Sequence, residues 1–128
     1  GCIMGRFIYC ATAEEKLCHY ISYFANEMGF GITGRQDVYS SDSTPFADAG
    51  VPALSFARLA PPPTGTIHNS YDTMALMSGE QMAQDIDFLI LFTGRMANAV
   101  RCPVEKKIPD NMKERLDEYL GRKRPKEA

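Results

Sequence analysis

The sequence lacks several features that would point directly to a class of function. It contains no tryptophan and only two histidines, and no apolar run reaches the roughly 20 residues that a membrane-spanning helix needs. Basic and acidic residues are intermixed, apart from a basic run from Arg122 to Lys126. A nucleic-acid or acidic-lipid surface would require a basic stripe, so we expect neither a nucleic acid nor a membrane as partner.

The sequence also lacks the cysteine spacing of a structural zinc site or redox motif. Its four cysteines are Cys2, Cys10, Cys18 and Cys102, and none forms a C-x-x-C pair. We expect buried free thiols, although an even count would permit disulfides in a secreted protein. No signal peptide is seen, which favours a reducing compartment and predicts a cytoplasmic location.

Length and composition predict one globular domain. The 128 residues are 45% hydrophobic with a net charge of −2, enough to bury a core. Residues 122–128 are expected to form a frayed basic tail. The sequence starts abruptly with a strand-like stretch at residues 2–10, as the C-terminal part of a larger catalytic domain would.

A helix is predicted after this first strand. Thr12 and Glu15 have the spacing of a capping box, whose side chains bond the first free amides of a helix. Gly29 is suited to end that helix with a left-handed residue. The apolar face of the helix is predicted to contain Leu17, Ile21, Phe24 and Met28.

The central part predicts short elements and a long loop. Residues 35–39 suit an edge strand or a loop, and a helix of two turns should start at Ser43 or Thr44 and end at Gly50. Residues 50–57 read as a buried strand. A proline-rich connection over residues 59–66 follows it.

Two helices are predicted in the C-terminal part. Ser78 to Gln81 is a second capping box that should open the longest helix, which ends at Cys102-Pro103. A last helix starts near Asp110 and ends at Gly121. The predicted apolar faces contain Met82, Ile86, Leu89, Ile90 and Val100 in the first of these helices and Met112, Leu116 and Leu120 in the second. This order indicates an α/β layered fold with few strands, as if part of the sheet were missing.

Two polar clusters flank the strand at residues 50–57. The first runs from Ser41 to Phe46 and the second from Ile67 to Thr73. Taken alone, Asp42 suits a helix cap, and His68 suits a cap, a core hydrogen bond or solvent exposure. His19 suits an exposed helix position. Local chemistry therefore leaves both clusters without an assigned function.

The ordered combination of these motifs resembles a known family. Ser-Asp-x-x-Pro-Phe at 41–46, Gly-Val-Pro-Ala at 50–53 and Ile-His-x-x-x-Asp-Thr at 67–73 are similar to the C-terminal part of di-zinc exopeptidases that include aminopeptidase Y, bacterial leucine aminopeptidases and glutaminyl cyclases. The resemblance covers about residues 1–100. It implies a fragment of a three-layer α/β/α sandwich that binds two zinc ions and hydrolyses N-terminal residues from peptides.

The resemblance also implies roles for individual residues. His68 matches a zinc ligand. Asp42 matches an acidic residue that contacts either the metal ligands or the substrate. Phe46 would line the pocket for the N-terminal side chain of a peptide substrate with a free N-terminus. The remaining positions in or beside this pocket are Ser43, Tyr71, Asp72 and Thr73. Of these, Asp72 and Thr73 would hold the ligand loop by hydrogen bonds to its backbone.

The chain departs from the family in its missing ligands. The other zinc ligands and the general-base glutamate have no counterpart in these 128 residues, and Glu14-Glu15 is assigned to the helix cap. We therefore expect the isolated chain to be inactive and to bind no zinc tightly. A non-catalytic α/β interaction or regulatory domain, with a possible homo-oligomer through a sheet edge or helix face, is the alternative. Cyclase chemistry is disfavoured because Ile67 stands where those relatives usually carry tryptophan.

Overall fold

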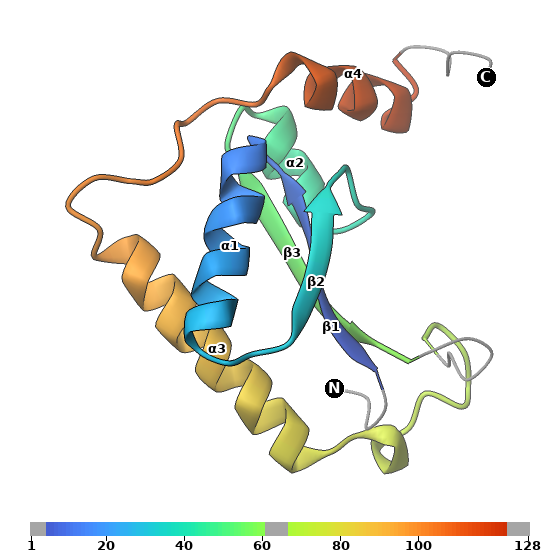
Figure 1. The fold of residues 1–128 in the computed structure, drawn as a ribbon. Coiled ribbons are helices and arrows are strands. Elements are labelled where there is room, and N and C mark those ends of the chain that lie inside the picture. Colours follow the sequence, from blue (N-terminus) through green and yellow to red (C-terminus); the bar gives the residue numbers. More distant parts are fainter. Residues whose placement is uncertain (1–4, 61–66, 123–128) are drawn as a thin grey trace.

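Three strands and four α-helices make up the part of the chain that the structure, a computed structural model, describes: residues 5–60 and 67–122. In order, they are β1 (Arg6–Thr12), α1 (Glu15–Glu27), β2 (Ile32–Gln36), α2 (Ser43–Asp48), β3 (Ala53–Leu59), a 3-10 turn η1 (Met74–Leu76), α3 (Gly79–Ala97) and α4 (Asp110–Tyr119). Figure 1 shows their arrangement. The α/β class predicted from the sequence is confirmed, although all three strands are displaced along the chain.

The sheet is small and mixed, with the strand order β2-β1-β3. β1 pairs in parallel with β2, and Phe7 lies opposite Ile32. It pairs antiparallel with β3, and Tyr9 lies opposite Phe56. β3 is half-buried along its whole length and pairs only with β1 among the described strands. The strand predicted at residues 50–57 is confirmed with shifted bounds, but it is half-buried and not buried, because β3 is an edge strand of the described sheet.

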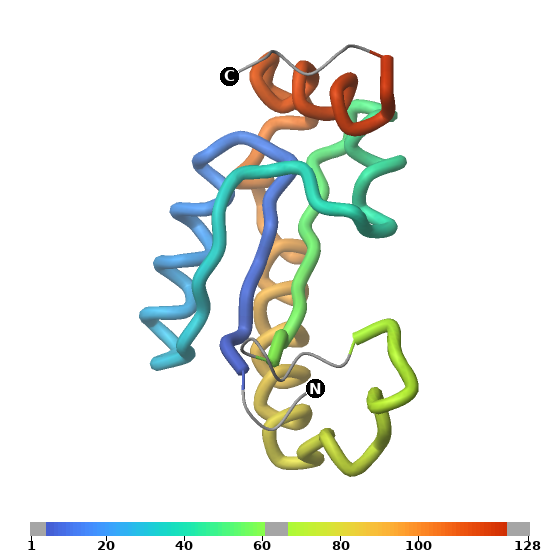
Figure 2. Tube along the Cα trace, turned by 90° about the vertical axis from the view of Figure 1, so that its right-hand side faces the viewer, coloured from blue at the N-terminus to red at the C-terminus, as the bar shows by residue number. Residues whose placement is uncertain are grey.

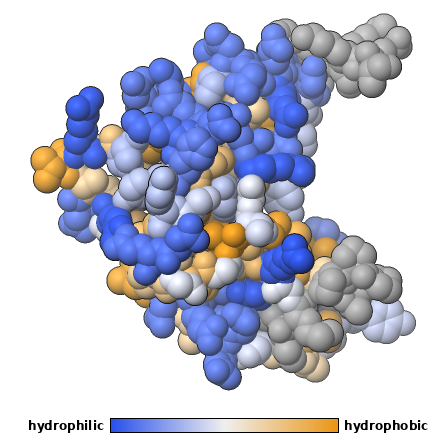
Figure 3. Space-filling view, viewed as in Figure 1, coloured by the Kyte–Doolittle hydropathy of each residue, from blue (hydrophilic) through white to orange (hydrophobic). Residues whose placement is uncertain are grey.

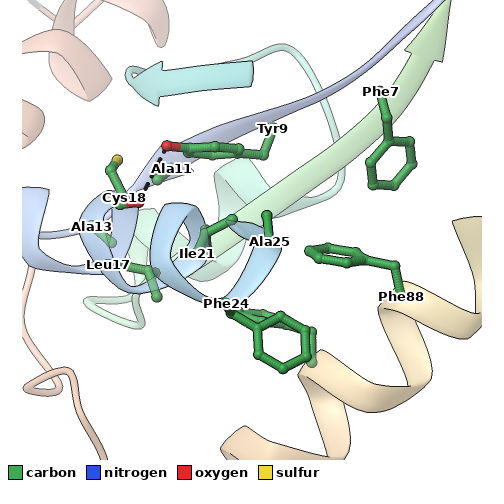
Figure 4. Close-up of a cluster of buried hydrophobic side chains, with 11 residues drawn as sticks. Phe7, Tyr9, Ala11, Ala13, Leu17, Cys18, Ile21, Phe24, Ala25 and Phe88 are labelled. Carbon is green, nitrogen blue, oxygen red and sulfur yellow. Dashed lines mark hydrogen bonds between the residues drawn. The ribbon is translucent and has the colours of Figure 1, made fainter. Parts of the chain in front are cut away.

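One face of the sheet carries the main core. Alternate side chains of β1, those of Phe7, Tyr9 and Ala11, are buried beneath α1 and α3. Figure 4 shows these side chains, with the Tyr9 hydroxyl donating a hydrogen bond to the Cys18 carbonyl oxygen at 3.4 Å. Phe88 of α3 stacks on Phe30 with ring centroids 4.3 Å apart. The packed rings fix α3 to this face of the sheet.

A described helix covers the opposite face of the sheet only at one end, where α2 contacts Ser55 of β3. Figure 2 looks onto this face, with the strands in front of α3. Side chains alternate across a sheet, so Ile8 and Cys10 of β1 point to it, together with Ala57 and Ser55, which lie opposite them on β3. All four are only half-buried. The described residues thus form two layers, and the third layer of the expected sandwich is not seen among them.

α4 packs at the end of the sheet through a second apolar cluster. Its Met112 and Leu116 are buried with Ile108 and Ala47. Arg122, which follows α4, donates to both carboxylate oxygens of Asp48 at 2.6 and 2.8 Å. The frayed tail expected from residue 122 therefore does not begin at Arg122, which is paired. Residues 123–128 lie outside the described residues.

Asp37 connects α4 to the sheet. Its carboxylate accepts hydrogen bonds from the Arg115 guanidinium of α4, from Arg35 and from the Val38 amide. Partial burial alone would raise the pKa of Asp37, but these three donors outweigh burial and hold it below its ordinary value. The Thr12 hydroxyl also donates to the Asp37 carbonyl oxygen at 2.8 Å. The residue therefore joins β1, the segment after β2 and α4.

Several helix ends follow the predicted signals, but the start of α1 does not. Ser78 caps α3 by accepting a hydrogen bond from the Gln81 amide, and Gly29, Gly50 and Gly121 all have positive φ beyond their helices. Thr12, however, ends β1 and does not cap α1, whose N-cap position is Glu14. The capping box predicted there is wrong, because the Thr12 hydroxyl is engaged by Asp37.

α3 is the longest described helix, as predicted, but it buries a different face. Its buried residues are Asp85, Phe88 and Phe92, whereas Ile86 and Ile90 are 46% and 61% exposed. The helix ends at Ala97, so the predicted end at Cys102 is also wrong. No described helix is long and apolar enough to cross a membrane.

Candidate functional site

The first motif forms α2 and an open groove beside it. Asp42, Ser43 and Phe46 line this groove of about 350 Å³ together with residues 51–54. Asp42 occupies the N-cap position of α2, yet its carboxylate makes no capping hydrogen bond. Phe46 is 61% exposed. The groove therefore has an accessible carboxylate and an accessible aromatic ring, two groups able to contact a ligand.

Three serine hydroxyls tie α2 to β3. The Oγ atoms of Ser41, Ser43 and Ser55 lie 2.6 to 2.8 Å from one another in a closed triangle. The Ser41 Oγ also accepts from the Ser43 amide at 3.3 Å. Ser43 is thus occupied by internal hydrogen bonds, which fix the start of α2 against the first half of β3.

The second motif forms an exposed turn before α3. His68 is exposed and has a φ of 67°, the left-handed conformation that only glycine adopts without cost. Among the described residues it is the one non-glycine with positive φ. Such an outlier supports a hypothesis of function, because the rest of the turn has to maintain the strained backbone. His68 therefore presents its imidazole on a backbone that costs free energy to form.

Asn69 holds this turn in place. Its side-chain oxygen accepts from the Tyr71 amide at 2.8 Å, and its carbonyl oxygen accepts from the Asp72 amide at 3.1 Å. The side chains of Asp72 and Thr73 make no hydrogen bond to another described residue, so the loop-fixing role expected of that pair is carried by Asn69. Tyr71 is 76% exposed. The turn thus has an internal brace and accessible side chains.

The two motifs lie at opposite ends of β3. Ser43 contacts Ser55 near the start of the strand, whereas the turn with His68 follows the end of the strand (Figures 1 and 2). A strand of seven residues is about 20 Å long. The described residues therefore do not bring Asp42 or Phe46 beside His68, and the pocket expected to contain all three is not formed by them.

A buried ion pair holds the end of β3 from which this loop departs. Arg58 donates to both carboxylate oxygens of Asp85 at 2.8 and 2.5 Å and to the Gly5 carbonyl oxygen at 2.5 Å. Both charged side chains are only 10% exposed. Arg58 therefore links β3 to α3 and to the start of β1, the three segments that surround the root of the loop.

The described residues contain no complete metal centre. No group of three or more histidine, cysteine, aspartate or glutamate side chains converges within residues 5–60 and 67–122, while a firmly held zinc ion needs three or four ligands. His68 can supply one neutral imidazole nitrogen. These residues alone therefore do not fit a zinc site.

The cysteines have no partner for a disulfide among the described residues. Cys10, Cys18 and Cys102 are free thiols. Burial and the nearby Asp37 carboxylate raise the pKa of Cys10 to about 11, so this thiol stays protonated at neutral pH and is a poor nucleophile. The burial expected of the thiols holds for Cys18, whereas Cys10 is half-buried and Cys102 is exposed.

Sequence patterns missed the residues that organise both motifs. The Arg58–Asp85 pair joins positions 27 residues apart, and its members sit in segments that read as strand and helix without any charge pattern linking them. Asn69 was detectable, since asparagine commonly bonds a backbone amide two residues later in a turn.

Comparison of the chain with models of known protein families, with characterised protein sequences and with solved structures finds no match.

Proposed function

We propose that this chain supplies His68 as one zinc ligand of a zinc-dependent aminopeptidase. The observation that carries the proposal is the exposed, positive-φ backbone of His68, at the position where the ordered motifs resemble those of di-zinc exopeptidases. Asn69 supports the assignment because it braces the turn. In such an enzyme, zinc lowers the pKa of a bound water and polarises the scissile carbonyl.

The remaining ligands and the general base have to come from protein outside these 128 residues. The largely uncovered face of the sheet and the outer edge of β3, which no described strand pairs, support this view because both are surfaces that additional chain can pack against. Asp42 and Phe46 then belong to a separate subsite. A peptide substrate would have to extend along β3 to contact this subsite and His68 at the same time. An upstream coding region that encodes His-x-Asp and Glu-Glu motifs would agree with this proposal. The absence of both motifs upstream would favour the non-catalytic interaction or regulatory domain.

His19 offers a matched control for the test. In the complete protein, His68→Ala is expected to lose bound zinc and the hydrolysis of leucine p-nitroanilide, while His19→Ala, an exposed substitution on α1, keeps both. Bound zinc is measured by mass spectrometry after dialysis. Circular dichroism measures the unfolding of both variants. Unchanged zinc content and turnover in His68→Ala would refute the ligand assignment.

The isolated chain provides a second test. It is expected to lose zinc on dialysis and to show no peptidase activity, because one histidine cannot hold the metal. One equivalent of zinc retained through dialysis would contradict the ligand count. The alternative function, a non-catalytic interaction domain, is favoured by the separation of Asp42 from His68 along β3. It predicts that the complete protein also lacks tight zinc.

A further inference from the structure

α3 has an apolar face directed away from the core. On a helix with 3.6 residues per turn, six residues of α3, Ile90 included, lie within about 40° of the direction of Ile90, on the side opposite Phe88. This outer stripe consists of Gly79, Ala83, Ile86, Ile90, Gly94 and Ala97. Ile86 and Ile90 are 46% and 61% exposed, and Figure 3 shows apolar surface in the region of α3. The stripe carries no charge.

Apart from Gly79 in the first turn, the spacing of residues in the outer stripe is symmetric about Ile90. Ala83 and Ala97 lie seven residues before and after it, and Ile86 and Gly94 lie four residues before and after it. The bulky residues therefore occupy the centre and one side, whereas small residues occupy the ends and the other side. This arrangement is complementary to itself when a second, identical helix is turned end for end.

We infer that α3 pairs antiparallel with α3 of a second copy of this chain, about a two-fold axis at Ile90. In such a pair a side chain enters the hole formed by four residues of the facing helix. Ile86 enters the hole formed by Ile90, Thr93, Gly94 and Ala97 of the second copy. An added Cβ at Gly94 would meet no described atom within 4 Å outside its own helix, so the monomer leaves this hole open.

The neighbouring charges are placed outside the contact. Arg95 is held by Glu27 at 2.6 and 3.0 Å and lies over the Phe24 ring, on the core side of the helix. Asp87 borders the outer stripe and is exposed, so it remains in contact with water at the rim. The interface is therefore apolar at its centre and polar at its edge, as specific interfaces are.

The inference predicts a weak, concentration-dependent dimer. A helix of 19 residues is about 28 Å long, and one helix pair buries less than the roughly 1,600 Å² of a standard interface. The inference is independent of the proposed zinc chemistry. It would hold for the isolated chain as well as for the complete protein.

Sedimentation equilibrium of the 128-residue chain between about 10 μM and about 1 mM tests the pairing in the range where weak dimers form. The wild type is expected to shift from monomer to dimer. Ile90→Lys, which places two ammonium groups opposite each other, is expected to weaken association at least tenfold. Gln84→Lys, an exposed change about 120° around the same helix, should leave association unchanged. A monomeric wild type throughout, or an unaffected dimer in Ile90→Lys, would overturn the inference.

Cysteine cross-linking tests the antiparallel register in a Cys2→Ser, Cys102→Ser background. Ile90→Cys is expected to form disulfide-linked dimers on oxidation, whereas Gln84→Cys is not. A mixture of Ala83→Cys and Ala97→Cys chains should cross-link more than either chain alone. Equal cross-linking at positions 84 and 90, or no gain in the mixture, would rule out the two-fold arrangement.

Discussion

Removing the Asp85 carboxylate should destabilise the protein strongly. Asp85→Ala leaves the Arg58 guanidinium in the same buried place, with the Gly5 carbonyl oxygen as an acceptor and the Phe7 ring 5.5 Å away. The two hydrogen bonds lost are charge-assisted. Removing one member of a buried ion pair costs more than the pair itself contributed, because the desolvation of the remaining charge is then compensated less well.

The expected loss is about 3 kcal/mol. Each hydrogen bond to a charged group contributes about 1.5 to 3 kcal/mol, and breaking a buried pair typically costs about 3 to 5 kcal/mol. We take the lower end because each side chain keeps 10% exposure and Arg58 keeps Gly5. For a domain of this size, the melting temperature should fall by about 10 °C.

Urea unfolding followed by circular dichroism measures this loss, with Asp87→Ala as the control. Asp87 lies two residues further along α3 and is exposed, so its substitution should change the free energy of unfolding by less than about 0.5 kcal/mol. The double variant Arg58→Met with Asp85→Leu should recover much of the loss, since no buried charge remains. A loss below about 1 kcal/mol in Asp85→Ala, or one matched by Asp87→Ala, would refute this account of the pair.

Two further predictions concern the sheet and α4. The lowered pKa of Asp37 means that its stabilising contribution is complete above the unfolded pKa of about 3.9 and is lost as the pH falls through the lower folded value. The difference in unfolding free energy between wild type and Asp37→Asn should therefore shrink from pH 7 to pH 3 in urea titrations; a constant difference would exclude this role. Gly34→Ala should cost about 2 kcal/mol or more, because its Cβ would lie 2.2 Å from the Tyr9 carbonyl oxygen. Gly94→Ala, with no such neighbour, should be neutral or stabilising by up to about 1 kcal/mol, and equal losses in both glycine variants in thermal melts would contradict the packing argument.

Features set by neighbouring residues were predictable from the sequence. The left-handed glycines that follow α1, α2 and α4 and the Ser78 cap of α3 depend on side chains within one or two helical turns. Periodicity also identified the buried Leu17, Ile21 and Phe24 of α1. Local chemistry decides these features, so distant parts of the chain do not alter them.

Features decided by distant partners were not predictable. Thr12 has the spacing of a cap but bonds a carbonyl oxygen 25 residues away. α3 turns toward the core the face that contains Phe88, Phe92 and Asp85, where Arg58 offers Asp85 a charged partner, and Ile86 and Ile90 are left on the outside. The candidate site was divided for a related reason, since the length of β3, which no motif encodes, separates Asp42 from His68.

The central position of β1 has a consequence for how the chain folds. Its parallel pairing with β2 joins residues about 25 positions apart, such as Phe7 and Ile32, through the single helix α1. Its antiparallel pairing with β3 joins residues about 40 to 50 positions apart, from Thr12 with Ala53 to Arg6 with Leu59. Closing the longer loop costs more chain entropy. The β1–α1–β2 unit is therefore expected to form first, and the arrival of β3 completes both the Arg58 anchor and the turn that carries His68.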